Sequence, residues 1–98
     1  KGRSKETEKA VAAGLMLIFE ELGACRDLPS DSQAAQDLVK KLRSYITQHY
    51  YNCTPEILAG LGKLYAGGGE FTENINKICG AGTAEFAAEA IAFYCGKA

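Results

Sequence analysis

Apolar residues recur along the chain at steps of three and four, and glycine or proline interrupts this pattern at intervals. Such spacing places the apolar side chains on one face of an α-helix, whereas a half-buried strand would alternate with a period of two. No stretch of the sequence alternates in that way. The pattern therefore predicts an all-α fold of about five helices, which we expect at residues 4–22, 30–49, 54–66, 71–78 and 83–96.

Two of these helices carry specific start signals. Ser30, with a glutamine three residues later, has the spacing of a capping box, which satisfies unpaired amides at a helix start. Thr54 is a preferred N-cap residue, and Pro55 at the first helical position loses no useful donor. Within the same helix Gly60 and Gly62 each cost up to about 1 kcal/mol relative to alanine, so we expect another element to pack closely against both.

The second helix is expected to bury one stripe and to expose its cations. The buried stripe should consist of Ala35, Leu38, Leu42, Tyr45, Ile46 and His49. Lys40, Lys41 and Arg43 then lie away from this stripe and form a small basic face, for which a solvated surface is the default interpretation.

Length and composition narrow the class of protein. We expect the 98 residues to form one domain, residues 1–98. With 47% apolar and 23% charged residues, the composition excludes an intrinsically disordered chain. Its net charge of −1 argues against nucleic-acid binding by this chain alone. The sequence has no secretory signal and no apolar stretch of the ~20 residues that a membrane span needs, so we expect a cytoplasmic location.

The four cysteines, Cys25, Cys53, Cys79 and Cys95, are too far apart in the sequence to form a CxxC pair. Structural zinc sites usually show short ligand spacings, so we expect no metal and no cofactor. Two disulfides in any of three pairings are compatible with the count, but a reducing compartment favours free thiols.

The most informative segment runs from Tyr50 to Glu56. Cys53 lies immediately before a helix start, where unpaired amides and the helix dipole favour a thiolate. Tyr50, Tyr51 and His49 add flat apolar surface with polar tips, a composition suited to a small-molecule pocket. The alternative is a packed and inert cysteine among core aromatic residues, because cysteine is one of the most buried residue types.

His49 is the only histidine in the chain. It could act as a general base for Cys53, but no acidic residue lies within one helical turn to complete such an assembly. A core position is the alternative for a lone histidine on an apolar stripe. We therefore expect a binding protein and not an enzyme.

The second half of the chain resembles the TipAS-type antibiotic-recognition domain of MerR-type transcription activators. The stretch from about Tyr45 to Tyr94 carries the resemblance in Tyr51-Asn52-Cys53, Glu56, Gly60-Leu61-Gly62 with Tyr65, Phe71-Thr72, Asn74-Ile75-Asn76, Gly82 to Phe86, and Ala90-Ile91. The chain departs from the family in having Gly68 where an aspartate is common, and no tryptophan.

The resemblance implies a single compact globin-like bundle that binds hydrophobic antibiotics such as thiopeptides. In thiopeptide-binding members a cysteine attacks a dehydroalanine of the drug, and Cys53 is the cysteine that matches. The expected ligand-binding residues are Cys53, Tyr50, Tyr51, His49, Asn52, Tyr45, Tyr65 and Phe71.

As a MerR-type ligand sensor, the protein would contact DNA only through a domain absent from this chain, and the full-length protein would be dimeric. The alternative is a stand-alone protein that sequesters the drug without binding DNA.

Overall fold

Five α-helices make up the part of the chain that the computed structural model describes, residues 5–96. They are α1 (Lys5–Ala24), α2 (Gln33–His49), α3 (Pro55–Tyr65), α4 (Glu70–Cys79) and α5 (Thr83–Gly96). The described residues contain no strand, so the predicted all-α fold is confirmed, with most helix ends within two residues of expectation. The expected start of the first helix at Ser4 lies outside the described residues.

The caps explain where two helices begin. Thr54 caps α3 as predicted, because its Oγ1 accepts a hydrogen bond from the amide of Ile57 at 3.2 Å. The predicted cap of α2 at Ser30 is wrong. Ser32 is the N-cap, and its Oγ accepts from the amide of Ala35 at 3.3 Å, so α2 starts three residues later than expected.

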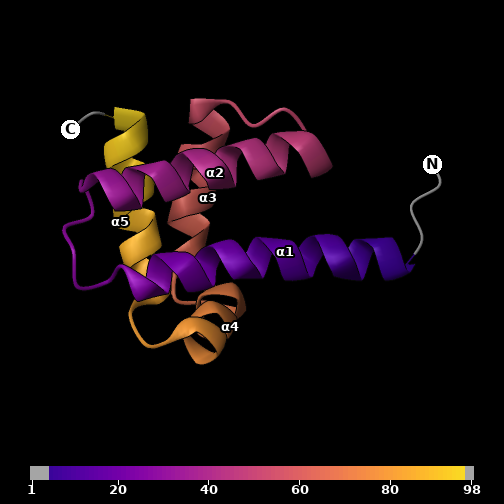
Figure 1. Cartoon of the computed structure of the whole chain (residues 1–98), viewed down its shortest axis with the longest axis horizontal. Helices are drawn as coiled ribbons and strands as arrows, with labels where there is room; N and C mark the ends of the chain where they lie inside the picture. The colour runs from indigo at the N-terminus through magenta and orange to yellow at the C-terminus, as the bar shows by residue number, and fades with distance from the viewer. Residues whose placement is uncertain (1–4, 97–98) are drawn as a thin grey trace.

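The helices pack in a crossed arrangement (Figure 1). Helices α1 and α2 lie one above the other, while α3 and α5 run beside each other across them, and α4 closes the lower end. A Cβ added at Gly62 of α3 would lie 3.0 Å from Cγ2 of Ile91 in α5, so this glycine permits the close approach that we expected. The same expectation is wrong for Gly60, which is exposed and faces open space.

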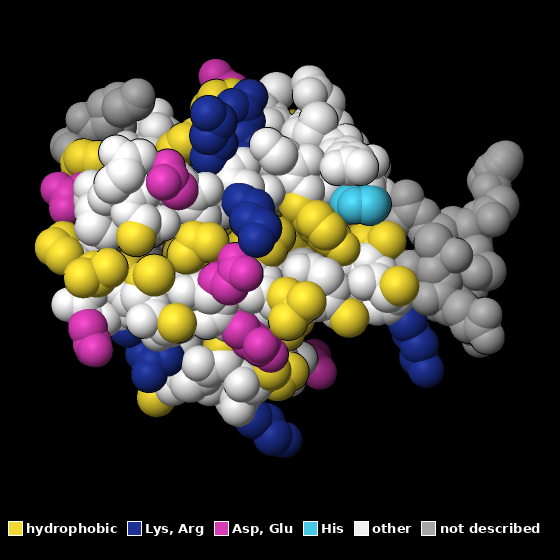
Figure 2. Space-filling model, in the orientation of Figure 1, with side chains coloured by type: hydrophobic (Ala, Val, Ile, Leu, Met, Phe, Trp, Pro, Cys, Tyr) yellow, Lys and Arg dark blue, Asp and Glu magenta, His cyan; other side chains and the backbone are white. Residues whose placement is uncertain are grey.

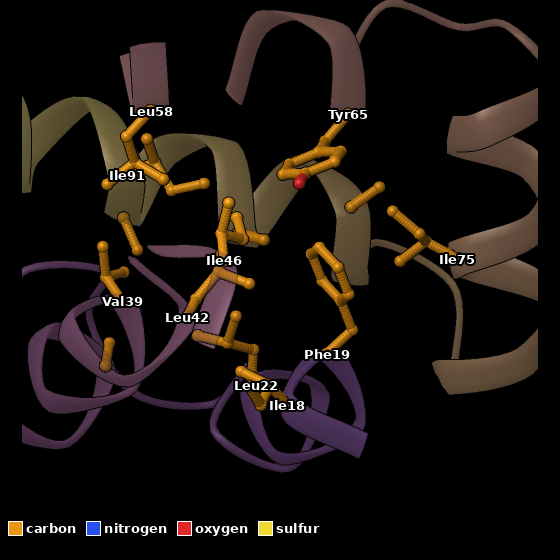
Figure 3. Packing of buried hydrophobic residues seen from close by; sticks show 14 of the residues in the cluster. Ile18, Phe19, Leu22, Val39, Leu42, Ile46, Leu58, Tyr65, Ile75 and Ile91 are labelled. Atoms are coloured by element: carbon orange, nitrogen blue, oxygen red, sulfur yellow. The ribbon is translucent and has the colours of Figure 1, made fainter. Parts of the chain in front are cut away.

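All five helices contribute to one hydrophobic core (Figure 3). Its large, fully buried members include Ile18, Phe19 and Leu22 from α1, Leu42 from α2, Leu58 from α3, Ile75 from α4 and Ile91 from α5. No helix within residues 5–96 combines the length and the apolar content needed to cross a bilayer.

The buried stripe of α2 differs in part from the prediction. The buried residues are Ala35, Val39, Leu42 and Ile46, whereas Leu38, Tyr45 and His49 are only partly buried. Val39 takes its place in the stripe because the buried face repeats at steps of three and four from Ala35. Tyr45 lies at the edge toward α1, where its hydroxyl donates a hydrogen bond to the carbonyl of Val11 at 2.6 Å.

Candidate ligand-binding site

Two aromatic rings pack against Tyr65, and a separate pair of tyrosines lies near enough to raise its pKa. This aromatic cluster consists of Phe19 from α1, Tyr50 and Tyr51 from the α2–α3 connection, Tyr65 from α3 and Phe71 from α4. The Tyr65 ring contacts Phe19 and Phe71 edge-on, with centroid separations of 4.9 and 5.1 Å. Burial raises the pKa of Tyr65, and the nearby Tyr51, Cys53 and Tyr50 add to this increase.

The cluster is closed toward the core and open toward solvent. Tyr65 is 2% exposed and Phe19 is fully buried, whereas Tyr50, Tyr51 and Phe71 are 45%, 50% and 37% exposed. Exposed aromatic residues around a buried one form an apolar surface with hydroxyl groups at its rim. Contiguous apolar surface of this kind marks sites for apolar ligands or partners.

Cys53 lies behind this surface, not on it. Its side chain is 0% exposed, and burial raises the pKa of the thiol. The Arg43 charge opposes that increase, while the nearby Cys95 adds to it. The expected activation of Cys53 by the helix start is therefore wrong for this conformation, because desolvation of the thiolate outweighs the favourable charge and amides.

Two side chains of α2 hold the backbone of Cys53 in place. Arg43 Nε donates to the Cys53 carbonyl at 2.7 Å, and the Cys53 amide donates to Thr47 Oγ1 at 3.1 Å. The prediction that Arg43 shares a solvated basic face is thus wrong, since this side chain is half-buried against the α2–α3 connection. Lys40 and Lys41 are exposed, as expected, and Lys41 pairs with Glu21 at 3.0 Å.

The other predicted site residues lie apart from the aromatic cluster. Tyr45 and His49 form a ring pair of their own, with centroids 4.4 Å apart. Figure 2 shows the histidine at the edge of hydrophobic side chains that gather where α1 and α2 meet. Asn52 lines a polar hollow with Arg43 and Tyr94. From the predicted set the structure places Phe71 in ring contact with Tyr65, and it places Tyr50, Tyr51 and Cys53 near enough to Tyr65 to raise its pKa.

Sequence reasoning missed a groove of about 590 Å³ between α3 and α5. Its lining is mostly small, with Ala59 and Gly62 on α3, Ala66 at the C-cap of that helix, and Ala88, Ala92 and Cys95 on α5. The volume is in the range of pockets for drug-sized ligands, which is about 300–1,000 Å³. The signal in the sequence is the recurrence of alanine and glycine at helical spacing in both segments, although it identifies a groove only once the two helices are known to be neighbours.

The cysteines of the described chain are all free thiols, as expected. Among the side chains that the structure describes, those of residues 9–96, no three histidine, cysteine or acidic groups are placed so that they could hold a metal ion.

Above about pH 9 we expect the free energy of unfolding to fall as pH rises. The pKa of Cys53 is raised from its ordinary value of 9.0, so the unfolded chain loses this proton before the folded chain does. The stability from burying the neutral thiol is complete below the unfolded pKa and is lost as pH rises through the folded pKa, by at most about 1.4 kcal/mol per pH unit. Urea unfolding at a series of pH values measures it. A Cys53→Ala variant should show a shallower decline, and an unchanged decline would contradict the assignment.

Comparisons with known proteins place this chain in a family. The TipAS antibiotic-recognition domain matches residues 1–94. The chain is 34% identical over 92 residues to the HTH-type transcriptional activator mta of Bacillus subtilis (strain 168), an alignment that covers 94% of this chain and 35% of that protein. The chain therefore spans about a third of the length of this relative. No solved structure matches the chain. With its five helices and its aromatic cluster, the chain belongs to the TipAS antibiotic-recognition domain family.

Proposed function

We propose that this chain is the ligand-sensing domain of a MerR-type transcription regulator and binds a bulky, apolar, antibiotic-like molecule. The observation that carries the proposal is the aromatic cluster, in which the exposed Phe71 packs against the buried Tyr65, and the exposed pair Tyr50 and Tyr51 lies near enough to raise the pKa of Tyr65. Exposed aromatic side chains that are grouped on a protein surface mark sites for apolar ligands or partners. The family's name and the relative's description as a transcriptional activator support the same function.

Regulation of transcription requires a DNA-binding part that this chain does not supply. The relative extends well beyond the matched segment. We assign DNA contact and dimerisation in a full-length regulator to such additional segments, and we place the regulator in the cytoplasm. A stand-alone drug-sequestering protein is the alternative, and a gene that encodes a helix-turn-helix ahead of Lys1 would exclude it.

Covalent capture at Cys53 is the finer part of the proposal. The Cys53 sulfur would add to the β-carbon of a dehydroalanine in the ligand, and the α-carbon would take up a proton as the carbon–carbon double bond becomes single. The thiol is sealed in the described conformation, so this step requires the α2–α3 connection to open after the ligand has bound. We therefore expect a slow, stoichiometric adduct and no turnover, which also separates this function from that of a thiol enzyme.

Removal of the exposed ring of Tyr51 or of Phe71 should weaken binding of the ligand. We expect Tyr51→Ala and Phe71→Ala each to raise the Kd for a thiopeptide antibiotic about 5- to 30-fold, the range for aromatic residues that anchor a ligand. Calorimetric titration measures the affinity.

The matched control is Ala92→Leu, which narrows the α3–α5 groove without touching the cluster. Unchanged affinity in this variant supports the cluster as the site. Loss of affinity in Ala92→Leu alone would show that the ligand binds in the α3–α5 groove and would contradict the cluster as the site. Intact-mass measurement then reports the adduct, which should be absent from Cys53→Ala.

A further inference from the structure

A polar hollow is lined by Arg43, the residue whose guanidinium also holds the Cys53 carbonyl. It has a volume of about 330 Å³ and is bounded by α2, the α2–α3 connection and α5. Its lining consists of Lys40, Arg43, Ser44, Thr47, Gln48, Asn52 and Tyr94. Two of these side chains are cationic, three carry hydroxyl groups, two are amides, and none is acidic. The hollow therefore has a positive character that the chain's net charge of −1 does not suggest.

Arg43 is the fixed element of this polar hollow. Its guanidinium is half-buried and donates to two neutral acceptors, the Cys53 carbonyl at 2.7 Å and the Tyr94 hydroxyl at 3.4 Å. Within the described chain the one salt bridge joins Lys41 to Glu21, so no described carboxylate neutralises Arg43. A guanidinium has five N–H donors in a planar fork that matches the oxygens of phosphate and carboxylate groups. A half-buried cation held in place with no counter-ion among the described residues is suited to bind an anion.

The neighbouring hydroxyl groups are available as donors. Tyr94 accepts from Arg43, and Thr47 accepts from the Cys53 amide, so each keeps its own hydrogen to donate. Ser44 and Lys40 are exposed at the rim and add another hydroxyl and a second positive charge. Donors that approach from several directions suit the tetrahedral phosphate group better than the planar carboxylate, which has only two oxygens.

We propose that the polar hollow is a binding site for the phosphate group of a small phosphorylated molecule. The site is separate from the aromatic cluster and does not depend on the proposed function. Arg43 links the polar hollow to Cys53, because the same guanidinium that would contact the phosphate also holds the Cys53 carbonyl. Binding of a phosphate group in the polar hollow should therefore change the surroundings of the Cys53 backbone.

The test is an amide-shift titration of the folded chain by NMR with phenyl phosphate, benzoate and benzyl alcohol as probes. Phenyl phosphate should give saturable shifts at Thr47, Asn52 and Cys53. Benzoate should bind at least about threefold more weakly, and benzyl alcohol should give no saturable shift at these amides. Absence of saturation with phenyl phosphate would overturn the site. Equal binding of benzoate would overturn the assignment to phosphate, and equal binding of benzyl alcohol would overturn any anion site.

Two variants and a control localise the effect. We expect Arg43→Met to weaken phenyl phosphate binding about tenfold or more, and Lys40→Met to weaken it about threefold. Lys40 is exposed and holds no described hydrogen bond, so its variant keeps the test decisive even if Arg43→Met fails to fold. The control is Lys63→Met on the wall of the α3–α5 groove, which removes the same charge elsewhere. Equal losses in Lys40→Met and Lys63→Met would show a general charge effect and overturn the site.

Discussion

Replacement of Phe19 by alanine should lower the free energy of unfolding by about 3–5 kcal/mol, the range for truncation of a buried aromatic side chain. Phe19 is 0% exposed and packs edge-on against Tyr65, with ring centroids 4.9 Å apart. Its removal leaves a cavity between α1 and α3 and takes away the contact that supports the buried face of the aromatic cluster. Urea-induced unfolding followed by circular dichroism measures the loss.

The matched control for this variant is Leu17→Ala, two positions earlier on the same helix. Leu17 is 58% exposed, so its truncation should change the free energy of unfolding by no more than about 0.5 kcal/mol. A loss of less than about 1 kcal/mol for Phe19→Ala, or equal losses for the two variants, would contradict the packing of α1 against Tyr65.

Most of the fold follows from local signals in the sequence. Helical spacing of apolar residues and the glycine and proline breaks located all five helices, because periodicity and chain breaks act within one or two turns. The cap at Thr54 was identifiable for the same reason, since its hydroxyl accepts from the amide of Ile57, only three residues along the chain. The cap of α2 was placed two residues too early, at Ser30, whereas the Ser32 hydroxyl accepts from the Ala35 amide.

The candidate site was less predictable, because its properties depend on contacts between distant segments. The surroundings of Cys53 in the sequence indicate an activated thiol, but the side chain is buried by elements outside that segment, and desolvation decides its pKa. The groove between α3 and α5 likewise requires knowledge of which helices are neighbours. The aromatic residues were identifiable by type, yet only the structure shows that Phe71 packs against Tyr65 and that Tyr45 packs against His49.

Arg43 contacts both the Cys53 backbone and the polar hollow. Its guanidinium holds the α2–α3 connection at the Cys53 carbonyl, and the same side chain lines the polar hollow. A thiol that is fully buried reacts with an outside reagent only through transient opening of the structure around it, so its labelling rate reports the free energy of that opening. The residues that hold the connection should therefore control how readily Cys53 reacts.

Replacement of Arg43 by methionine should accelerate labelling of Cys53 by iodoacetamide about 10- to 100-fold, because a hydrogen bond from a charged donor contributes about 1.5–3 kcal/mol. Loss of the Arg43 charge also removes an effect that lowers the Cys53 pKa, but this matters little in the opened state, where water solvates the thiolate. Mass spectrometry of the peptide that contains Cys53 measures its rate separately from those of the three half-buried thiols. Lys40→Met removes a neighbouring charge that has no described bond to Cys53 and should leave the rate unchanged. Similar rates in the wild type and in Arg43→Met would show that Arg43 does not hold the connection closed.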